Sequence, residues 1–210
     1  MNADTRDRIV RTARELFWAK GFQSTSIADI LSRSQIHSGS LYHFFRGKQQ
    51  LLVAVLESYR DGIGPMLLEP AWAGIDDPKA RIFALLNGYR TQLVGTDFAY
   101  GCPIGSLALE LHEPDPEVRE LLAANFDNWV AAIEGCLDAM GERLPATVDL
   151  HALAEFILTV MEGAVMQART HRDIGVYDRN VATLRAHLDA LEQAAAPADH
   201  GRARLKGAGR

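Results

Sequence analysis

The residues best suited to chemistry lie in one short segment, 26–52, which reads SIADILSRSQIHSGSLYHFFRGKQQLL. It concentrates hydroxyl, aromatic and basic side chains, including Arg33, Arg46 and Lys48, and residues 32–50 contain no acid. Hydrogen-bonding and cationic groups without carboxylates suit a phosphate-lined groove. The segment therefore indicates a surface that binds a polyanion. The plainer alternative is a structural helical hairpin whose serines only cap helices.

The charge of the chain is unevenly distributed in a way that supports the first interpretation. Residues 1–60 hold nine Lys/Arg against five Asp/Glu, within a chain whose formal net charge is −5. A basic head on an acidic body suggests that the head alone meets a polyanion. Hydrophobic residues make up 48% of the chain and charged residues 23%, as in a soluble protein with a core. No apolar run is long enough to span a bilayer, so we expect a cytoplasmic protein that does not contact the membrane.

Catalytic and metal-binding patterns are absent from the sequence. Glu110 and His112 stand two apart, on different sides of a helix, and no HExxH, GxSxG or phosphate loop occurs. Cys102 and Cys136 show no CxxC spacing. We therefore expect no enzyme, no metal site and no cofactor. Cys102 precedes Pro103 at a helix start, where the helix dipole could lower the pKa of the thiol. A thiol of this kind could sense electrophiles or oxidants. The plainer alternative is an inert buried thiol.

The elements that must position these residues are all helices. Apolar residues recur at helical spacing throughout, and no run has the period of a strand, so the fold class is all-α with about nine helices. The first helix should end at Lys20-Gly21, and Ser26 should open the second with Asp29 as its capping-box partner. Ser38 can cap a third helix. Two short helices braced by a first form a helix-turn-helix unit, whose second helix enters the major groove.

The rest of the chain predicts a larger helical domain. A fourth helix begins near residues 47–48 and should end or kink at 61–65, DGIGP, which we interpret as a possible hinge or as a plain helix end. Further helices are expected from 78 to about 94, from 103, from 116 to 141, from 147 to 172 and from 178 to 195, with loops at 69–80 and 95–101. We divide the chain into a helix-turn-helix DNA-binding domain (1–47), an effector-binding and dimerisation domain (48–196) and a disordered basic tail (197–210).

The last two helices carry apolar stripes spaced three and four residues apart, typical of a helix-on-helix seam. The stripes could pack against the body, but a two-fold related pair of chains would join them into a four-helix bundle. We favour a homodimer with this interface: Leu150, Leu153, Ile157, Val181, Leu184, Leu188 and Leu191.

The segment from Phe17 to Leu52 resembles the DNA-binding domain of the TetR family of bacterial transcriptional regulators. The resemblance is carried by a Gly-aromatic pair, a following Thr, an Ile-x-x-Ile helix, Ser-x-Gly, Tyr-x-x-Phe and a helix-opening Lys, at these positions: Gly21-Phe22, Thr25, Ile27, Ile30, Ser38, Gly39, Tyr42, Phe45 and Lys48. The chain departs from the family in its turn, where Ser34-Gln35 replace Ala-Gly. A non-glycine residue must then adopt a left-handed conformation at a cost of about 1 kcal/mol.

The resemblance implies a function and a set of site residues. It implies a repressor that binds a palindromic double-stranded DNA operator and is released when a small effector binds the helical body. DNA contacts are expected from Thr25, Ser26, Ser38, Ser40, Tyr42, His43 and Lys48, with Ser40 and His43 facing bases and the others phosphates or helix starts.

The effector itself is expected to be largely hydrophobic or aromatic, because no constellation of charges points to a charged one. Its pocket should have apolar and aromatic walls, chosen from Phe83, Leu86, Tyr89, Cys102, Ile104, Leu107, Trp129, Ile133, Phe156 and Met161. An enzyme would need a catalytic cluster, and a purely architectural DNA binder would not need some 150 residues of acidic helical body.

Overall fold

The computed structural model describes residues 2–196, and the predicted tail at 197–210 lies outside them. The described residues contain no strand, which confirms the all-α fold class. In chain order the helices are α1 Asn2–Lys20, α2 Ile27–Ser34, α3 Ser38–Phe44, α4 Lys48–Ile63, the π-helix η1 Gly64–Leu68, α5 Glu69–Trp72, α6 Pro78–Gly95, α7 Pro103–Glu110, α8 Pro116–Ala139, the 3₁₀-helix η2 Gly141–Arg143, α9 Leu150–His171 and α10 Ile174–Ala195.

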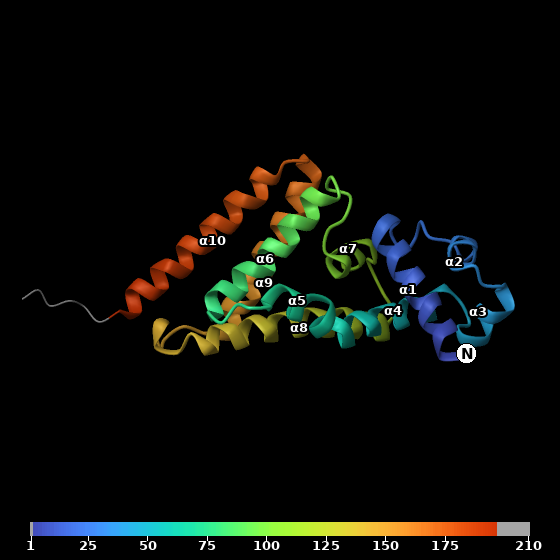
Figure 1. Ribbon diagram of the computed structural model, residues 1–210, viewed down its shortest axis with the longest axis horizontal. Helices are drawn as coiled ribbons and strands as arrows, with labels where there is room; N and C mark the ends of the chain where they lie inside the picture. The colour runs from blue at the N-terminus through green and yellow to red at the C-terminus, as the bar shows by residue number, and fades with distance from the viewer. Residues whose placement is uncertain (1, 197–210) are drawn as a thin grey trace, which may run out of the picture.

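Helices α1, α2 and α3 form a small unit at one end of the molecule (Figure 1). Ile9, Phe17, Ile30, Leu41 and Phe45 are almost completely buried and form its core. This core explains the apolar spacing of the three helices, because each helix presents one apolar face to the others. The unit rests on α4, which packs against α1 and also along α8.

The turn between α2 and α3 has the strained residue that the sequence predicts. Gln35 adopts φ 53° and ψ 44°, the left-handed conformation, and its N–H bonds to the carbonyl of Leu31. The beginning of α3 differs from the prediction. Ser38 is the first residue of the helix, and His37 is its N-cap without a side-chain hydrogen bond. The Ser38 hydroxyl therefore does not cap the helix and remains exposed.

The fourth helix does not end at the DGIGP segment. It changes into the π-helix η1, in which the N–H of Glu69 bonds to the carbonyl of Gly64, and it continues into α5. A π-helical turn accommodates Pro65, which has no N–H, without a break in the rod, and such turns are frequent at functional sites. The predicted loop at 69–80 is therefore shorter, because α5 occupies its first residues. The hinge at 61–65 stays a prediction.

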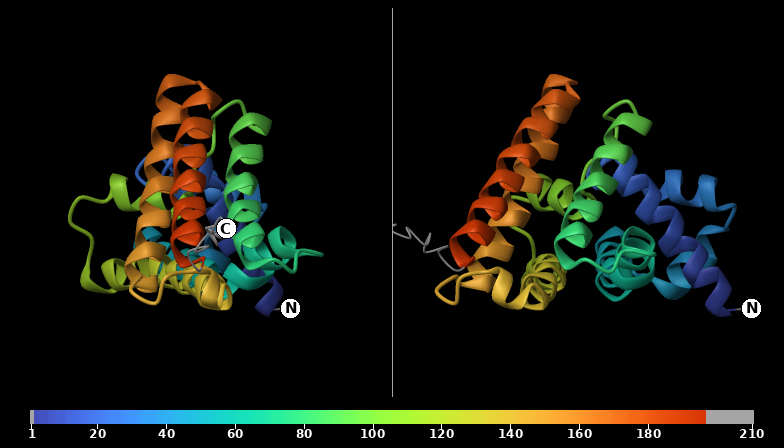
Figure 2. Two further views of the ribbon diagram at one scale, coloured as in Figure 1. Left: turned by 90° about the vertical axis from the view of Figure 1, so that its left-hand side faces the viewer. Right: turned by 60° about the vertical axis from the view of Figure 1, so that its left-hand side comes forward.

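Helices α6, α9 and α10 run side by side above α8, which lies across one end of them (Figures 1 and 2). The last helix begins at Ile174, four residues before its predicted start. Its N-cap is Asp173, whose carboxylate accepts the N–H of Gly175 at 2.8 Å. The prediction missed this cap because the apolar seam becomes clear only further along the helix.

The two apolar stripes pack against each other within one chain, so four members of the predicted dimer interface are covered by the chain itself. Leu153, Ile157, Leu184 and Leu188 are at most 7% exposed, and α9 and α10 are direct neighbours. The remaining members of that prediction, Leu150, Val181 and Leu191, are half-buried and pack on the same core. The four buried residues therefore belong to the body of the chain, whereas a place in a dimer interface stays a prediction for Leu150, Val181 and Leu191. The apolar spacing does mark a buried face of each helix, and in the buried positions that face packs on the neighbouring helix of the same chain.

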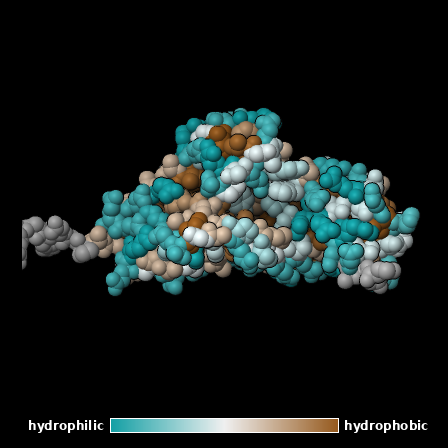
Figure 3. Space-filling view, in the orientation of Figure 1, coloured by the Kyte–Doolittle hydropathy of each residue, from teal (hydrophilic) through white to brown (hydrophobic). Residues whose placement is uncertain are grey.

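The surface of the molecule is mainly hydrophilic on the face that Figure 3 shows, with hydrophobic atoms in small patches. Within residues 2–196, no helix is long and apolar enough to cross a membrane. The same residues contain no group of His, Cys, Asp or Glu side chains arranged to hold a metal ion.

Candidate functional site

The outer face of α3 carries four of the seven predicted DNA contacts, Ser38, Ser40, Tyr42 and His43. Tyr42 is 55% exposed, and Ser38 and His43 are also exposed, whereas Ser40 is half-buried. The His43 ring packs edge-on against Phe44 at 4.9 Å between centroids, which limits the positions that the imidazole can take. The helix therefore presents two aromatic side chains with polar groups next to serines, while Leu41 anchors its other face in the core.

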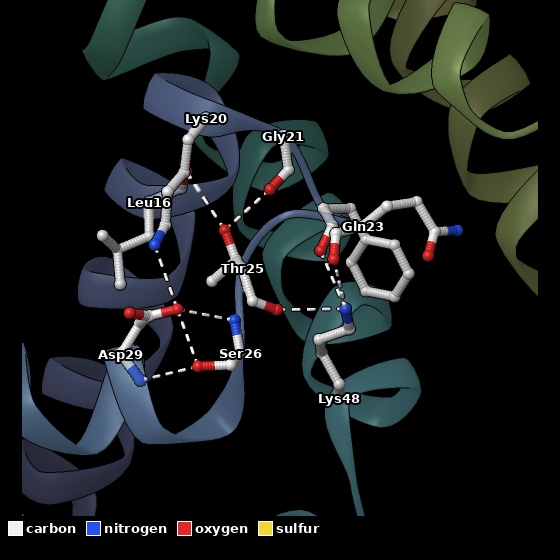
Figure 4. Close-up of polar contacts among 9 residues, drawn as sticks. Leu16, Lys20, Gly21, Gln23, Thr25, Ser26, Asp29 and Lys48 are labelled. Atoms are coloured by element: carbon white, nitrogen blue, oxygen red, sulfur yellow. Dashed lines mark hydrogen bonds and ion pairs between the residues drawn. The ribbon is translucent and has the colours of Figure 1, made fainter.

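The loop between α1 and α2 is fixed by side-chain hydrogen bonds (Figure 4). Ser26 and Asp29 form the predicted capping box: Ser26 Oγ accepts the N–H of Asp29, and Asp29 Oδ2 accepts the N–H of Ser26. Lys20 Nζ lies 3.0 Å from Asp29 Oδ2. These contacts lower the pKa of Asp29, the hydrogen bond from Ser26 being the largest cause. The carboxylate therefore stays ionised and holds the start of α2 against the end of α1.

Thr25 differs from its predicted role. Its side chain is completely buried, and its hydroxyl donates to the carbonyl of Gly21 at 2.6 Å. A buried hydroxyl that is already used within the loop cannot contact a phosphate, so the prediction of such a contact by this side chain is wrong. The threonine instead closes the turn that follows α1.

Lys48 also binds this loop. Its ammonium donates to the carbonyls of Phe22 at 2.9 Å and Thr25 at 3.0 Å, with Gln23 at 3.4 Å, and lies 4.3 Å from the centre of the Phe22 ring (Figure 4). These acceptors give Lys48 a structural role that its position at a helix start did not reveal. Its phosphate contact stays a prediction.

Glu110, the last residue of α7, holds the same loop from the other side. Its carboxylate accepts the N–H of Phe22 at 2.9 Å and the N–H of Gln23 at 2.6 Å. Gly21 has φ +86°, and a Cβ at this position would lie 2.9 Å from Glu110 Oε2. Only glycine adopts this conformation at low cost and leaves room for the carboxylate. The loop is therefore fixed between Lys48 of α4, which donates hydrogen bonds to its carbonyls, and Glu110 of α7, which accepts hydrogen bonds from its N–H groups.

Part of the basic surplus of the first 60 residues is engaged in contacts within the chain. Three of its cations form ion pairs: Lys20 with Asp29, Arg33 with Glu15, and Arg60 with Asp61. Arg14 lies in a cavity, where its guanidinium donates to the sulfur of Met66. The count of basic residues therefore overstates the positive charge that is free to meet a polyanion.

A cavity of about 410 Å³ lies between the helix-turn-helix unit and the body. Its walls come from α1, α4, η1, α6, α7, α8 and α9, and they include Trp18, Tyr59, Ile63, Leu67 and Phe126. Four of the predicted pocket residues line it: Tyr89, Cys102, Ile104 and Trp129. Phe83, Leu86, Leu107, Ile133 and Met161 are buried in the core outside it, and Phe156 is 47% exposed on the surface. The contribution of α1 was not predicted, because sequence spacing does not show which side of α1 meets the body.

The cavity contains a carboxyl group that the sequence prediction missed. Glu162 of α9 lines it, and its Oε1 is buried without a hydrogen-bond partner. Burial raises the pKa of Glu162. A signal for this residue existed, because Glu162 is the only charged side chain between Glu155 and Arg169, in the mainly apolar middle of α9.

Cys102 is the N-cap of α7, and its sulfur accepts the N–H of Gly105 at 3.5 Å. Burial, followed by the nearby charge of Glu162, raises the pKa of the Cys102 thiol. This corrects the expectation that the helix dipole lowers it, because loss of hydration opposes the thiolate more strongly than the helix start favours it. The geometry supports the inert alternative, a small buried thiol.

Comparisons with known proteins agree with this architecture. Residues 9–55 match the family described as "Bacterial regulatory proteins, tetR family", and residues 78–179 match "Transcriptional regulator LmrA/YxaF-like, C-terminal domain". An uncharacterised HTH-type transcriptional regulator of Mycobacterium tuberculosis is 32% identical over 178 residues, which span 82% of this chain and 88% of that protein.

Another similar protein is the HTH-type transcriptional repressor NemR of Escherichia coli, 26% identical over 178 residues that cover 80% of this chain and 86% of NemR. Among solved structures, the regulatory protein TetR from Rhodobacter sphaeroides superposes with a TM-score of 0.77 at 25% identity, covering 86% of this chain and 97% of that chain. These proteins are transcriptional regulators and not enzymes. The chain belongs to the TetR family of DNA-binding transcriptional regulators.

Proposed function

We propose that the protein is a homodimeric repressor that binds a palindromic operator through α3 and leaves it when a small, largely hydrophobic or aromatic molecule enters the cavity. The observation that carries this proposal is the position of α7. Its first turn, with Pro103 and Ile104, lines the cavity, and its last residue, Glu110, binds the backbone of the α1–α2 loop. Eight residues of helix span about 12 Å, so one rigid element joins the cavity to the helix-turn-helix unit.

A second contact joins the same parts. Trp18 of α1 lines the cavity, and its indole N–H donates to the carbonyl of Gly101 at 2.8 Å, just before α7. Its ring stacks on Tyr100 at 4.8 Å between centroids. A ligand that displaces Trp18 or the first turn of α7 would therefore change the orientation of the helix-turn-helix unit relative to the body. In a dimer that reads two half-sites at a fixed separation, such a change lowers the affinity for DNA.

The outer face of α9 is the better candidate for the dimer interface. Phe156, Thr159, Gly163 and Met166 follow one another at spacings of three, four and three residues on that face, and Phe156 and Met166 are 47% and 49% exposed. Phe156 packs edge-on against His187 of α10, so the face extends over both helices. A second copy of the chain would cover these apolar side chains and form a four-helix bundle from two α9–α10 pairs.

Three measurements test this function. We propose that the protein acts in the cytoplasm. On the DNA upstream of its own coding region, it should give a two-fold symmetric footprint. His43→Ala should change the preferred sequence, whereas His112→Ala, at an exposed histidine of the body, should leave it unchanged. Removal of the protein should raise expression from that DNA. A footprint without symmetry, or lower expression after removal, would contradict the dimeric repressor.

The dimer has its own test. Phe156→Glu would place a charge in the proposed interface and should produce monomers in analytical ultracentrifugation with unchanged helix content. Val94→Glu, at an apolar residue of α6 that is 51% exposed and does not line the groove of Thr159, Gly163 and Met166, serves as the control. A Phe156→Glu protein that remains a dimer would show that another surface joins the two chains.

A further inference from the structure

Two buried polar atoms that line the cavity have no hydrogen-bond partner, the indole N–H of Trp129 and Oε1 of Glu162, and Glu162 is the one of these two residues that can carry a charge. Glu162 lines both the cavity and a groove that opens between α7, α8 and α9. Its Oε1 has no hydrogen-bond partner. A Cβ on Gly105 would come 2.2 Å from its Oε2, so the first turn of α7 has a glycine where the carboxyl group packs against it. The side chain is held at a defined place and is not a mobile surface acid.

No cation of the described residues neutralises this carboxyl group. The two arginines that line the cavity and the groove have other partners: Arg14 bonds to Met66 and lies over the ring of Tyr59, and Arg169 donates to the carbonyls of Phe98 and Ala99. Of the other acids that line these hollows, Glu15 is paired with Arg33, and Asp127 and Glu155 line only the groove. The Cys102 thiol beside this carboxyl group lowers the pKa of Glu162, but burial raises it more. A buried carboxylate that no cation neutralises costs several kcal/mol relative to water. The cavity is therefore prepared for a positive group that the protein does not supply.

The walls around Glu162 define the rest of the ligand. Trp18, Tyr59, Phe126 and Trp129 offer aromatic surface, and the rest of the lining is mainly aliphatic. A volume of about 410 Å³ lies at the lower end of the range for small-molecule sites. Aromatic faces attract both flat apolar rings and cations. One or two fused rings that carry a single amine satisfy the walls and the carboxylate together.

We propose that the effector is a small aromatic amine whose protonated nitrogen pairs with Glu162 inside the cavity. This proposal rests on the proposed function, and it adds a charge to an effector whose body is largely apolar. An ionised carboxylate accepts hydrogen bonds and cannot donate them, so the ammonium supplies both the missing donor and the missing charge. A neutral alcohol would supply only the donor, and an anionic analogue would be repelled.

Matched probes separate these possibilities. Phenethylamine and naphthylethylamine would be compared with phenethyl alcohol, naphthylethanol, phenylacetate and naphthylacetate by isothermal titration calorimetry on the full-length protein at pH 7. We expect the better amine to bind at least about tenfold more tightly than its alcohol, with the acid weakest. The comparison within the wild-type protein needs no variant. An alcohol or acid that binds as tightly as its amine would overturn the proposal.

Variants then assign the preference to one residue. Glu162→Gln keeps the shape and removes the charge, so the advantage of the amine over the alcohol should disappear. Glu155→Gln, an exposed acid that lines only the groove, should keep that advantage. Circular dichroism checks that each variant is folded. An amine preference that survives Glu162→Gln would overturn the assignment.

A DNA gel shift with the same probes separates failure of this proposal from failure of the proposed function. Release of DNA by the amines, and by the alcohols only at higher concentration, supports both. A protein that binds DNA but binds no amine, or that is released equally well by the alcohols, keeps its regulatory function and overturns the amine proposal. A protein that binds amines but no DNA contradicts the proposed function and leaves the ligand class supported.

Discussion

Replacing Glu110 with alanine tests whether α7 holds the DNA-reading unit in place. The carboxylate accepts two backbone N–H groups, those of Phe22 at 2.9 Å and Gln23 at 2.6 Å. Hydrogen bonds to charged groups contribute about 1.5–3 kcal/mol each, and the lower value applies because the site is only partly buried. We therefore expect Glu110→Ala to lower the free energy of unfolding by about 2–3 kcal/mol. A loss of this size is a large part of the stability of a typical domain.

Local opening of the loop gives the sharper measurement. Hydrogen exchange followed by mass spectrometry should show faster exchange at Phe22 and Gln23 in the variant, with little change in α9 and α10. Glu110→Gln should be intermediate, because one oxygen remains an acceptor while the amide group faces the other N–H. Glu113→Ala, which removes an exposed acid just beyond α7, is the matched control. Equal exchange in Glu110→Ala and Glu113→Ala would refute the structural role of this contact.

The remaining predictions concern charge and reactivity. Glu162→Gln should stabilise the protein at pH 7. Burial raises the pKa of Glu162 above 4.5, so the wild type loses stability as the pH rises above that value. The difference in urea midpoint between the variant and the wild type should therefore vanish below about pH 4.5. Cys102 should not react with iodoacetamide in the native protein at pH 7, because burial raises its pKa; a mass increase at Cys102 before unfolding would restore the sensor hypothesis. Lys48→Ala should weaken binding to all DNA sequences and flatten the salt dependence by about one charge, besides loosening the loop; an unchanged salt slope would leave Lys48 with its structural role alone.

Local chemistry explains which parts of the fold could be predicted from the sequence. Ser26 and Asp77 begin helices because their side chains accept amides of the first turn, and this requires only neighbouring residues. Gln35 had to be left-handed because the turn requires it. The π-helix at Gly64–Leu68 could not be predicted in this way, since a Gly-Pro sequence equally suits an end, a kink or a π-turn, and the packing of the body decides among them.

The apolar stripes of α9 and α10 show a different limit. A spacing of three and four residues records that a helix face is buried, but it does not record what buries it. Leu153 and Leu184 satisfy the pattern against the neighbouring helix of the same chain, whereas the exposed residues Phe156 and Met166 follow the same spacing on the opposite face. Two faces of one helix therefore carry helical periodicity, and only the packed structure shows which is internal.

The functional residues divide according to how far their partners lie along the chain. The exposed face of α3 could be predicted, because a helix-turn-helix unit presents that face to DNA. The roles of Lys48 and Glu110 could not, since their partners lie about 25 and 88 residues away in the chain, and the bonds are to backbone atoms that leave no trace in residue types. Glu162 shows how a single residue type can still indicate a functional position when its partner is not visible in the sequence. A carboxyl group that a helix turns toward a cavity lowers the stability of the body unless a cation neutralises it, and Oε1 of Glu162 has no partner among the described residues. If the proposed ligand binds there, this charge was the sequence signal for it, whereas most of the predicted aromatic and aliphatic pocket residues serve the core.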